Sequence, residues 1–285
     1  MGEGAAPAAD GTGFWNGAHA KLDVLKGILR ATGGLAVAFS GGVDSTFLLA
    51  AACGELGDRV LAVSAASRAF PMRELAEARA FCGERGIRQV VVDAHEVDAP
   101  GYRDNPPDRC YLCKTVLFGA LWDCARERGF EVLADGSNVD DEGDYRPGMR
   151  ALAELGVRSP LREAGLTKAE IRLLSHEMGL PTWDKPSFAC LSSRFPYGER
   201  ITDEGLARVD AAEQYLLGRG LHQVRVRVHG GTVARIETLP GEFDMVAAEP
   251  ARSEIRDRLR GLGFSYVALD LGGYRSGSLN EVLGG

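Results

Sequence analysis

The run Ser40-Gly41-Gly42-Val43-Asp44-Ser45 combines residue types that bind phosphate, and it lies between an apolar strand pattern and a helical pattern. Backbone N–H groups at the start of a helix form an anion site together with the helix dipole. The glycines let the backbone approach phosphate oxygens closely, and the serine hydroxyls add donors. Asp44 carries the same sign of charge as phosphate, so it indicates a Mg²⁺ held between carboxylate and phosphates. An ordinary glycine-rich turn is the alternative, which the serines and the aspartate together disfavour.

The six cysteines divide into two groups by their expected surroundings. Cys110 and Cys113 form a C-x-x-C pair in a turn-rich segment, and Cys190 lies in a second loop. The other three lie in helical patterns, where a free cysteine is commonly a small buried hydrophobe: Cys53, Cys82 and Cys124. Six cysteines in a chain of this length are not a secreted disulfide framework. We therefore expect three cysteines to do chemistry.

Three loop cysteines without an evident fourth favour a [4Fe–4S] cluster with one open iron over a structural zinc site, which takes four ligands. A single C-x-x-C pair is also compatible with a redox pair or half of a zinc site. His176 and His229 could supply a fourth ligand. However, the first lies in an amphipathic helical pattern and the second ends a strand pattern, so each has an easy structural role.

The elements that position these residues alternate along the chain, which predicts an α/β fold with a parallel sheet and helices on both faces. We expect strands at 35–39, 59–64, 88–93 and 131–135, and helices at 15–32, 45–56, 71–86 and 112–128. Helices at 149–155 and 168–178 follow, and Thr167 with Glu170 forms a capping box at the start of the second.

The order of elements changes after a proline-rich stretch, 181–197. There we expect, in chain order, a helix at 203–219, strands at 221–228 and 231–238, a helix at 249–262 and a strand at 264–269. Gly230-Gly231 indicates a hairpin between the first two strands. The expected organisation is a disordered tail (1–13), an α/β domain (14–197) and a smaller α+β domain (198–285) that contributes to substrate binding and oligomerisation.

The composition excludes several classes of protein. With 45% hydrophobic and 26% charged residues among 285, the chain is neither wholly disordered nor fibrous. The 33 basic and 40 acidic residues give a net charge of −7, which disfavours a protein dominated by nucleic-acid phosphates. No apolar run approaches the roughly 18–20 residues that span a bilayer, and no signal peptide is evident. We expect a cytoplasmic protein without a membrane partner.

Three segments resemble the nucleotide loops of the PP-loop ATP pyrophosphatases, which cleave ATP between the α- and β-phosphates and adenylate an oxygen of the substrate. The run 40–45 is similar to the PP-loop, Asp135–Asp141 to the second loop, and Ser159-Pro160-Leu161 with the helix start at 168–172 to the third. The resemblance implies an adenine nucleotide alpha hydrolase-like domain that binds ATP and Mg²⁺. The residues that it implicates are Ser40, Gly41, Gly42, Val43, Asp44, Ser45, Gly136, Asn138, Lys168 and Arg172.

Longer segments resemble the LarE family, and together they cover nearly the whole chain outside the tail: 183–198 (WDKPSFACLSSRFPYG), 144–148 (DYRPG), 224–230 (VRVRVHG) and 273–278 (GYRSGS). LarE proteins are ATP-dependent sulfur transferases that build the nickel-pincer nucleotide cofactor of lactate racemase. The resemblance implies that ATP adenylates the carboxylates of a pyridinium-3,5-biscarboxylate mononucleotide. A sulfur nucleophile then displaces AMP and leaves thiocarboxylates.

The family has two variants, which differ in the source of the sulfur. In one, a cysteine at the position of Cys190 gives up its own sulfur and becomes dehydroalanine. In the other, that cysteine and a C-x-x-C pair hold a [4Fe–4S] cluster whose open iron carries an added sulfide. Because Cys110 and Cys113 accompany Cys190 here, the resemblance implies the cluster variant and catalytic sulfur transfer, fed by a separate sulfide donor.

The resemblance also assigns roles to residues near Cys190 and in the C-terminal part. Ser193 and Arg194 are expected to shape the catalytic site beside Cys190, and Arg225 and Arg227 to contact the substrate phosphate. Glu213 and Asp244 match acidic positions near a bound metal. Family members assemble as hexamers, so a homo-oligomer is expected.

Two other functions fit part of the sequence. A tRNA-thiolating PP-loop enzyme also uses three cluster cysteines, but a basic surface or an added RNA-binding element would be expected, and this chain is acidic. The second alternative is a module that senses a nucleotide and binds a metal but catalyses no reaction, and it would give Cys190 no role. A pyrophosphate-release assay separates the sensor from the enzymes. A glutamine-dependent amidotransferase is disfavoured because no glutaminase domain fits in this length.

Overall fold

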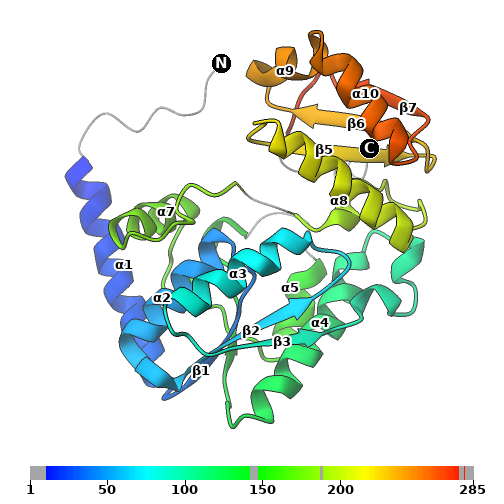
Figure 1. Cartoon of the computed structure of the whole chain (residues 1–285). Helices are drawn as coiled ribbons and strands as arrows, with labels where there is room; N and C mark the ends of the chain where they lie inside the picture. The colour runs from blue at the N-terminus through cyan, green and yellow to red at the C-terminus, as the bar shows by residue number, and fades with distance from the viewer. Residues whose placement is uncertain (1–10, 142–146, 187–188, 276–278, 280–285) are drawn as a thin grey trace. The chain divides into compact units, whose positions relative to one another are not determined.

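The chain forms two compact units, each with its own sheet and core, in a computed structural model that describes residues 11–141, 147–186, 189–275 and Leu279 (Figure 1). The first unit comprises Met1–Ala66, Arg73–Ala94 and Lys114–Ser187. The second comprises Ser67–Met72, His95–Cys113 and Phe188–Gly285. Several residues of the family-like segments lie outside the described ranges: 144–146, 187–188 and 276–278.

The division differs from the one expected at residue 198, because two earlier segments join the second unit. Ala69, Val97 and Tyr102 are buried in the same hydrophobic cluster as Leu191 and Val226. Apolar burial therefore draws 67–72 and 95–113 out of the α/β domain. The expected tail, 1–13, lies mostly outside the described ranges, and the first helix begins at Gly11.

The first unit contains the parallel sheet predicted from the alternating pattern. Its strands lie in the order β3-β2-β1-β4 and are β1 (Leu35–Ala38), β2 (Val60–Ala66), β3 (Gln89–Asp93) and β4 (Leu133–Ala134). The connecting helices are α2 (Val43–Leu56), α3 (Met72–Glu84) and α4 (Arg109–Arg126). The fold class predicted for this part of the chain is thereby confirmed.

The strand order reverses direction once within the sheet. From β1 the chain steps outward to β2 and β3 (Figure 1), and it then returns past β1 to β4. Because parallel crossovers are right-handed, this reversal places α4 on the opposite face from α2 and α3. The carboxyl ends of β1 and β4 thus flank a topological switch point, where ligands bind in open α/β sheets.

Helices from both ends of the first unit pack together: α1 (Gly11–Ala31) and α7 (Lys168–Glu177) contact α2, and α6 (Pro160–Glu163) contacts α1. The predicted capping box begins α7, because Thr167 Oγ1 accepts from Glu170 N and Glu170 Oε2 accepts from Thr167 N. This cap directs the α7 N-terminus, with Lys168, toward the loop after β4. The helix expected at 149–155 is α5 (Pro147–Glu154).

The second unit contains a three-stranded mixed sheet in the order β5-β6-β7. The strands are β5 (Val224–His229), β6 (Val233–Thr238) and β7 (Tyr266–Leu269). The hairpin expected at Gly230-Gly231 joins β5 to β6, with φ of +56° and +68° at the two glycines. The helices of this part of the chain are α8 (Asp203–Gly218), α9 (Phe243–Ala247) and α10 (Ala251–Gly261). In neither unit is a described helix both long and apolar enough to cross a membrane.

Candidate active site

The loop 40–45 joins β1 to α2 at the switch point. Gly41 has φ +75°, and a Cβ at this position would lie 3.2 Å from Ala78 Cβ on α3, so glycine permits both the backbone conformation and the close approach. Ser40 Oγ lies 3.0 Å from Ser45 Oγ, and Gly42 N donates to Ser40 Oγ over 3.4 Å. The amide and hydroxyl groups thus gather at the N-terminus of α2, where a phosphate would be favoured.

Asp44 lies among three polar residues from other loops. Lys168 Nζ donates to Asp44 Oδ2, and Asn138 Nδ2 donates to Asp44 Oδ1 over 3.4 Å. Asp140 Oδ2 accepts from Lys168 N at 2.7 Å, which fixes the start of α7 against the loop after β4. Burial raises the pKa of Asp44, and Lys168 opposes that shift. The structure therefore brings together the predicted residues Asp44, Asn138 and Lys168.

The loop after β4 lies directly against the start of α2. A Cβ on Gly136 would lie 2.9 Å from Ser45 N. Ser159, from the third predicted loop, donates through Oγ to Asp135 Oδ1 at 2.7 Å, and Asp135 N donates to Arg158 O at 2.9 Å. All three predicted nucleotide loops therefore converge at the switch point.

The three cysteines that were expected in loops all belong to the second unit. Cys190 lies in the segment 189–196, which we call the Cys190 loop. Cys110 and Cys113 lie in the first turns of α4 and not in a loop, because this helix begins at Arg109 and not near residue 112 as expected. Two side chains of the segment 95–113 hold the Cys190 loop. Tyr102 Oη lies 2.5 Å from Ser192 Oγ, and Arg109 Nη1 donates to Ser192 O over 3.1 Å.

Asn105 connects the same two segments from a left-handed backbone conformation, with φ +54°. Its buried Nδ2 donates to Phe195 O over 3.1 Å and to Pro196 O over 2.7 Å. Its Oδ1 accepts from Arg109 Nη1. Asn and Asp tolerate this conformation better than most residues. These bonds explain how cysteines about 80 residues apart in sequence belong to one unit.

The pKa of Cys113 and the pKa of the buried Arg109 both depend on the neighbouring cysteines. Burial raises the pKa of Cys113 well above its usual value, and Cys190, Glu96 and Cys110 raise it further. Burial disfavours the Arg109 cation, but Cys190, Cys110 and two tyrosines together raise its pKa above the usual value. Arg109 in turn lowers the pKa of Cys113, in opposition to burial.

Arg194 supports the Cys190 loop from inside the core. Its side chain is fully buried, and Nε and Nη2 donate to the two oxygens of Glu213 on α8 at 2.7 and 2.9 Å. Nη1 donates to Ser193 Oγ over 2.7 Å and to Cys190 O over 3.2 Å. Ser193 Oγ in turn donates to Cys190 O over 2.8 Å. Arg194 therefore positions Cys190 from the interior.

Arg225 and Arg227 lie on β5 and are both buried. Arg227 pairs with Glu237 on β6 at 3.0 Å and donates through Nη1 to Ser193 O over 2.6 Å. Burial lowers the pKa of Arg225 to about 10, and the nearby Arg194 lowers it further. Arg225 Cζ lies 5.3 Å from the centre of the Tyr274 ring. The two arginines thus place positive charge next to the Cys190 loop.

Comparison with known proteins decides the family. Over 264 residues, 91% of this chain and 92% of the relative, the chain is 40% identical to pyridinium-3,5-bisthiocarboxylic acid mononucleotide synthase of Lactiplantibacillus plantarum. The chain belongs to the LarE family. No protein-family model matches it. An uncharacterized protein of Synechocystis is 43% identical over 265 residues, 93% of this chain and 98% of the relative.

The LarE chain also has partial similarity to other PP-loop enzymes. It is 31% identical to the tRNA-specific 2-thiouridylase of Pelobacter propionicus over 188 residues, which are 53% of this chain and 51% of that protein. Relatives of this class use ATP, in agreement with the nucleotide loops described above. The chain is therefore an ATP-dependent sulfur transferase.

Glu213, which the family resemblance places near a bound metal, forms a buried ion pair with Arg194 in this LarE chain. Oε1 accepts from Arg194 Nε and from Val226 N, and Oε2 accepts from Arg194 Nη2, with the side chain 3% exposed. Asp244 is exposed on α9. Within the described ranges no group of three or more His, Cys, Asp or Glu side chains is arranged around a single metal ion. Glu213 thus acts as a structural counter-ion in this structure.

Of the two histidines considered as fourth ligands, His176 packs against an aromatic ring, whereas the buried Nε2 of His229 has no hydrogen-bond partner among the described residues. The His176 ring on α7 lies edge-on to Trp183, with 4.6 Å between ring centres. Burial lowers the pKa of His229, which ends β5.

The helical cysteines Cys82 and Cys124 are buried, as expected, whereas Cys53 is half-buried.

Several side chains around the loop 40–45 and the Cys190 loop were not predicted from the sequence: Lys185, Tyr102, Asn105, Arg109 and Glu237. Because Arg109 directly precedes Cys110, its position in the sequence could have indicated a charge next to the cysteines. Glu237 is the register partner of Arg225 across the hairpin, which the turn position alone could have indicated.

Arg172 donates to Trp183 O and Lys185 O at 2.7 and 2.8 Å. Its contact with nucleotide stays a prediction.

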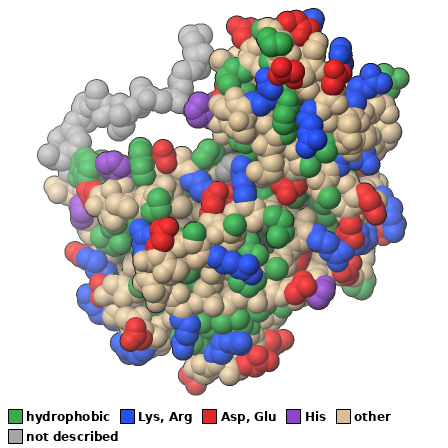
Figure 2. Space-filling view, in the orientation of Figure 1, with side chains coloured by type: hydrophobic (Ala, Val, Ile, Leu, Met, Phe, Trp, Pro, Cys, Tyr) green, Lys and Arg blue, Asp and Glu red, His purple; other side chains and the backbone are tan. Residues whose placement is uncertain are grey.

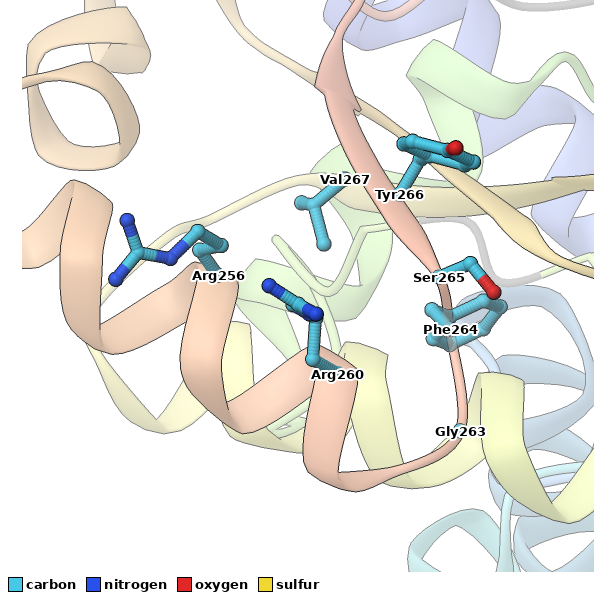
Figure 3. A pocket seen from close by; sticks show the side chains of 7 residues that line it. All are labelled: Arg256, Arg260, Gly263, Phe264, Ser265, Tyr266 and Val267. Carbon is cyan, nitrogen blue, oxygen red and sulfur yellow. The ribbon is translucent and has the colours of Figure 1, made fainter.

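The lining of one surface hollow in the second unit contains no residue of the predicted site. Figure 3 shows its lining, with Arg256 and Arg260 on α10 beside Val267 and Tyr266 of β7. Arg256 pairs with Asp257 at 2.8 Å, and Tyr266 is 70% exposed. On the face shown in Figure 2, acidic and basic side chains are interspersed.

Gly136→Ala tests the convergence of the nucleotide loops in the LarE chain. The added methyl group would press on Ser45 N and on Asp44, so we expect ATP-analogue affinity to fall by about tenfold or more. Isothermal titration calorimetry measures this change. The control is Gly17→Ala, where the new Cβ meets open space on α1 and binding should be unchanged. Wild-type affinity in Gly136→Ala would contradict the close approach of the loops.

Proposed function

We propose that this LarE-family enzyme adenylates the carboxylates of pyridinium-3,5-biscarboxylate mononucleotide and converts them to thiocarboxylates. The relative from Lactiplantibacillus plantarum is named for the bisthiocarboxylic acid product. The proposal rests on one combination of features in this chain. Three nucleotide loops converge in the first unit, and in the second unit the Cys190 loop lies next to two buried arginines. In this assignment the product contributes to the nickel-pincer nucleotide cofactor of lactate racemase.

The nucleotide loops supply what adenylation requires. A substrate carboxylate oxygen attacks the α-phosphorus of ATP, the α–β P–O bond breaks, and pyrophosphate leaves. The amides and hydroxyls of the loop 40–45 would bind the departing phosphates. Asp44 would hold Mg²⁺, a hard cation that prefers carboxylate and phosphate oxygens. In that state Lys168, which pairs with Asp44 here, would be close to the phosphates as well.

The second step is attack by sulfide on the acyl carbon, which forms a C–S bond and breaks the bond to AMP. Arg225 and Arg227 would bind the substrate phosphate, as the family resemblance implies. Their burial supports this role. Removing the guanidinium group from water lowers the pKa of Arg225, and a bound phosphate dianion would offset that desolvation cost. Substrate binding and oligomerisation by the second unit stay predictions.

Cys110, Cys113 and Cys190 would hold a [4Fe–4S] cluster. The donor set fits, because thiolates are the ligands of such clusters, and buried Arg109 balances their charge. Each thiolate of a cluster binds a different iron, so the three sulfurs need not surround one point as the ligands of a single ion do. When bound, the cluster would supply a sulfide at its open iron. The cytoplasmic location, the sulfide donor and the hexamer stay predictions.

Anaerobic turnover tests the proposed function. Reconstituted enzyme incubated with ATP, Mg²⁺, sulfide and the biscarboxylate nucleotide should yield a thiocarboxylate, AMP and pyrophosphate, measured by mass spectrometry and a pyrophosphate assay. Parallel reactions with tRNA test the thiolating alternative, to which the partial similarity to the 2-thiouridylase points. Thiolated tRNA without any thiocarboxylate would overturn the substrate assignment. ATP binding without pyrophosphate release for either substrate would indicate a sensor.

The state of Cys190 after turnover tests the source of the sulfur. We expect the intact mass of the Cys190 peptide after many turnovers, because the sulfur comes from outside the protein. Mass spectrometry of the digested enzyme measures this directly, with the Cys53 peptide as an internal reference. Loss of H₂S from Cys190 would show sacrificial transfer. A preparation without iron or charge-transfer absorption would likewise contradict the cluster.

A further inference from the structure

Lys185 is largely shielded from solvent within the first unit and contacts the loop 40–45 through the carbonyl of Gly41. Its side chain is 13% exposed, and Nζ donates to Gly41 O over 3.2 Å. The same ammonium donates to Glu74 Oε2 over 2.7 Å and to Glu77 Oε2 over 2.6 Å, both on α3. An ammonium has three donors, so all of them are used.

The backbone at Lys185 is held as firmly as its side chain. Lys185 N donates to Thr182 O over 3.0 Å, and Lys185 O accepts from Arg172 Nη2 over 2.8 Å. Arg172 Nη1 also donates to Trp183 O over 2.7 Å. Side chain and backbone together therefore fix the position of the ammonium relative to α3 and α7.

The contact with Gly41 O determines which way the Gly41–Gly42 peptide faces. In a trans peptide the carbonyl and the N–H point in opposite directions. With Gly41 O held by Lys185, Gly42 N–H points toward Ser40 Oγ, where the phosphate-binding groups gather. Glycine adopts positive and negative φ with similar ease, so a peptide between two glycines can also turn the other way. That orientation would direct a carbonyl oxygen at the phosphate.

We propose that Lys185 is a positioning residue of the ATP site, which holds the Gly41–Gly42 peptide with its N–H facing the bound phosphates. The inference rests on the proposed function, because it assigns a role within that site. Lys185 is not itself a phosphate ligand, since two carboxylates and a carbonyl already take its protons.

The test compares two ligands that differ in the phosphates they carry. For Lys185→Met we expect affinity for α,β-methylene-ATP to fall about tenfold, because the loop loses its fixed donor, and affinity for AMP to stay unchanged. Isothermal titration calorimetry measures both. The matched control is Lys26→Met, a lysine on α1 that pairs with Asp23 at 3.4 Å, and it should bind both ligands as the wild type does.

A second variant separates positioning from direct phosphate binding. In Glu74→Gln/Glu77→Gln the ammonium loses both carboxylates. If Lys185 bound phosphate directly, release from these partners would tighten analogue binding. The positioning role instead predicts binding weakened about threefold, because the ammonium is no longer held against Gly41.

Each outcome bears on a different assignment. Unchanged analogue affinity in Lys185→Met, an equal loss of AMP and analogue affinity, or unchanged or tighter binding in the double variant would overturn the positioning role. Failure of the wild-type protein to bind the analogue would instead overturn the proposed function. The two failures are therefore distinguishable in one set of titrations.

Discussion

Replacing Cys190 with serine should abolish thiocarboxylate formation while pyrophosphate is still released in a single burst. Adenylation depends on the loops of the first unit, whereas Cys190 lies in the second. The loop should keep its conformation, because Arg194 and Ser193 bind the carbonyl oxygen of Cys190 and not its sulfur. Serine is a close isostere but a poor iron ligand. The assay is rapid-quench measurement of pyrophosphate and thiocarboxylate.

Cys110 and Cys113 distinguish the two sources of sulfur. If the three cysteines hold a cluster, Cys110→Ala and Cys113→Ala should each abolish product as completely as Cys190→Ser does. If Cys190 alone donates its sulfur, both variants should complete one turnover. Cys53→Ala is the matched control, because this half-buried cysteine lies in α2 of the first unit and should retain activity. Full activity in Cys190→Ser would contradict every sulfur-transfer role assigned to this residue.

Replacing Arg194 with methionine should lower the free energy of unfolding by about 3–5 kcal/mol, because it leaves the Glu213 carboxylate buried without its cation. The loss of three further bonds to the Cys190 loop should also reduce thiocarboxylate formation. Chemical denaturation of the full chain, followed by circular dichroism, measures the stability.

The double variant Arg194→Met/Glu213→Leu should recover part of this stability, since it buries no unpaired charge. Recovery is incomplete because Val226 N loses its acceptor, Glu213 Oε1. The control is Arg256→Met, an exposed arginine paired with Asp257, which should change stability by no more than about 0.5 kcal/mol. A loss in Arg194→Met no larger than in this control would show that the buried pair contributes little.

The local features of this protein follow from sequence periodicity. The strand–helix alternation, the capping box at Thr167 and the hairpin at Gly230-Gly231 all appear as predicted. Each depends on residues only a few positions apart, so the side-chain pattern carries the information. The sequence of the loop 40–45 likewise predicted its place between a strand and a helix, because phosphate binding needs those residue types in one continuous run.

The assignment of segments to the two units depended on the tertiary structure. The sequence pattern shows that Val97 and Tyr102 are apolar, but not that they pack with Leu191 and Val226 rather than with the parallel sheet. The hydrophobic effect is non-directional and does not depend on separation in sequence. Which apolar segments pack together is therefore decided by the fit of their shapes in the folded protein.

The partners of the buried charges were also decided only in three dimensions. In sequence, Arg194, Lys185 and Glu213 resemble ordinary surface residues or ligand candidates. In the structure Arg194 and Glu213 are buried and the Lys185 side chain is only 13% exposed. Their bonds to residues distant in sequence hold the loop 40–45 and the Cys190 loop. A buried charge must be paired to offset the cost of leaving water, and its partner can come from any part of the chain. The sequence thus determined which chemistry this LarE chain carries, and the tertiary structure decided which side chains hold that chemistry in place.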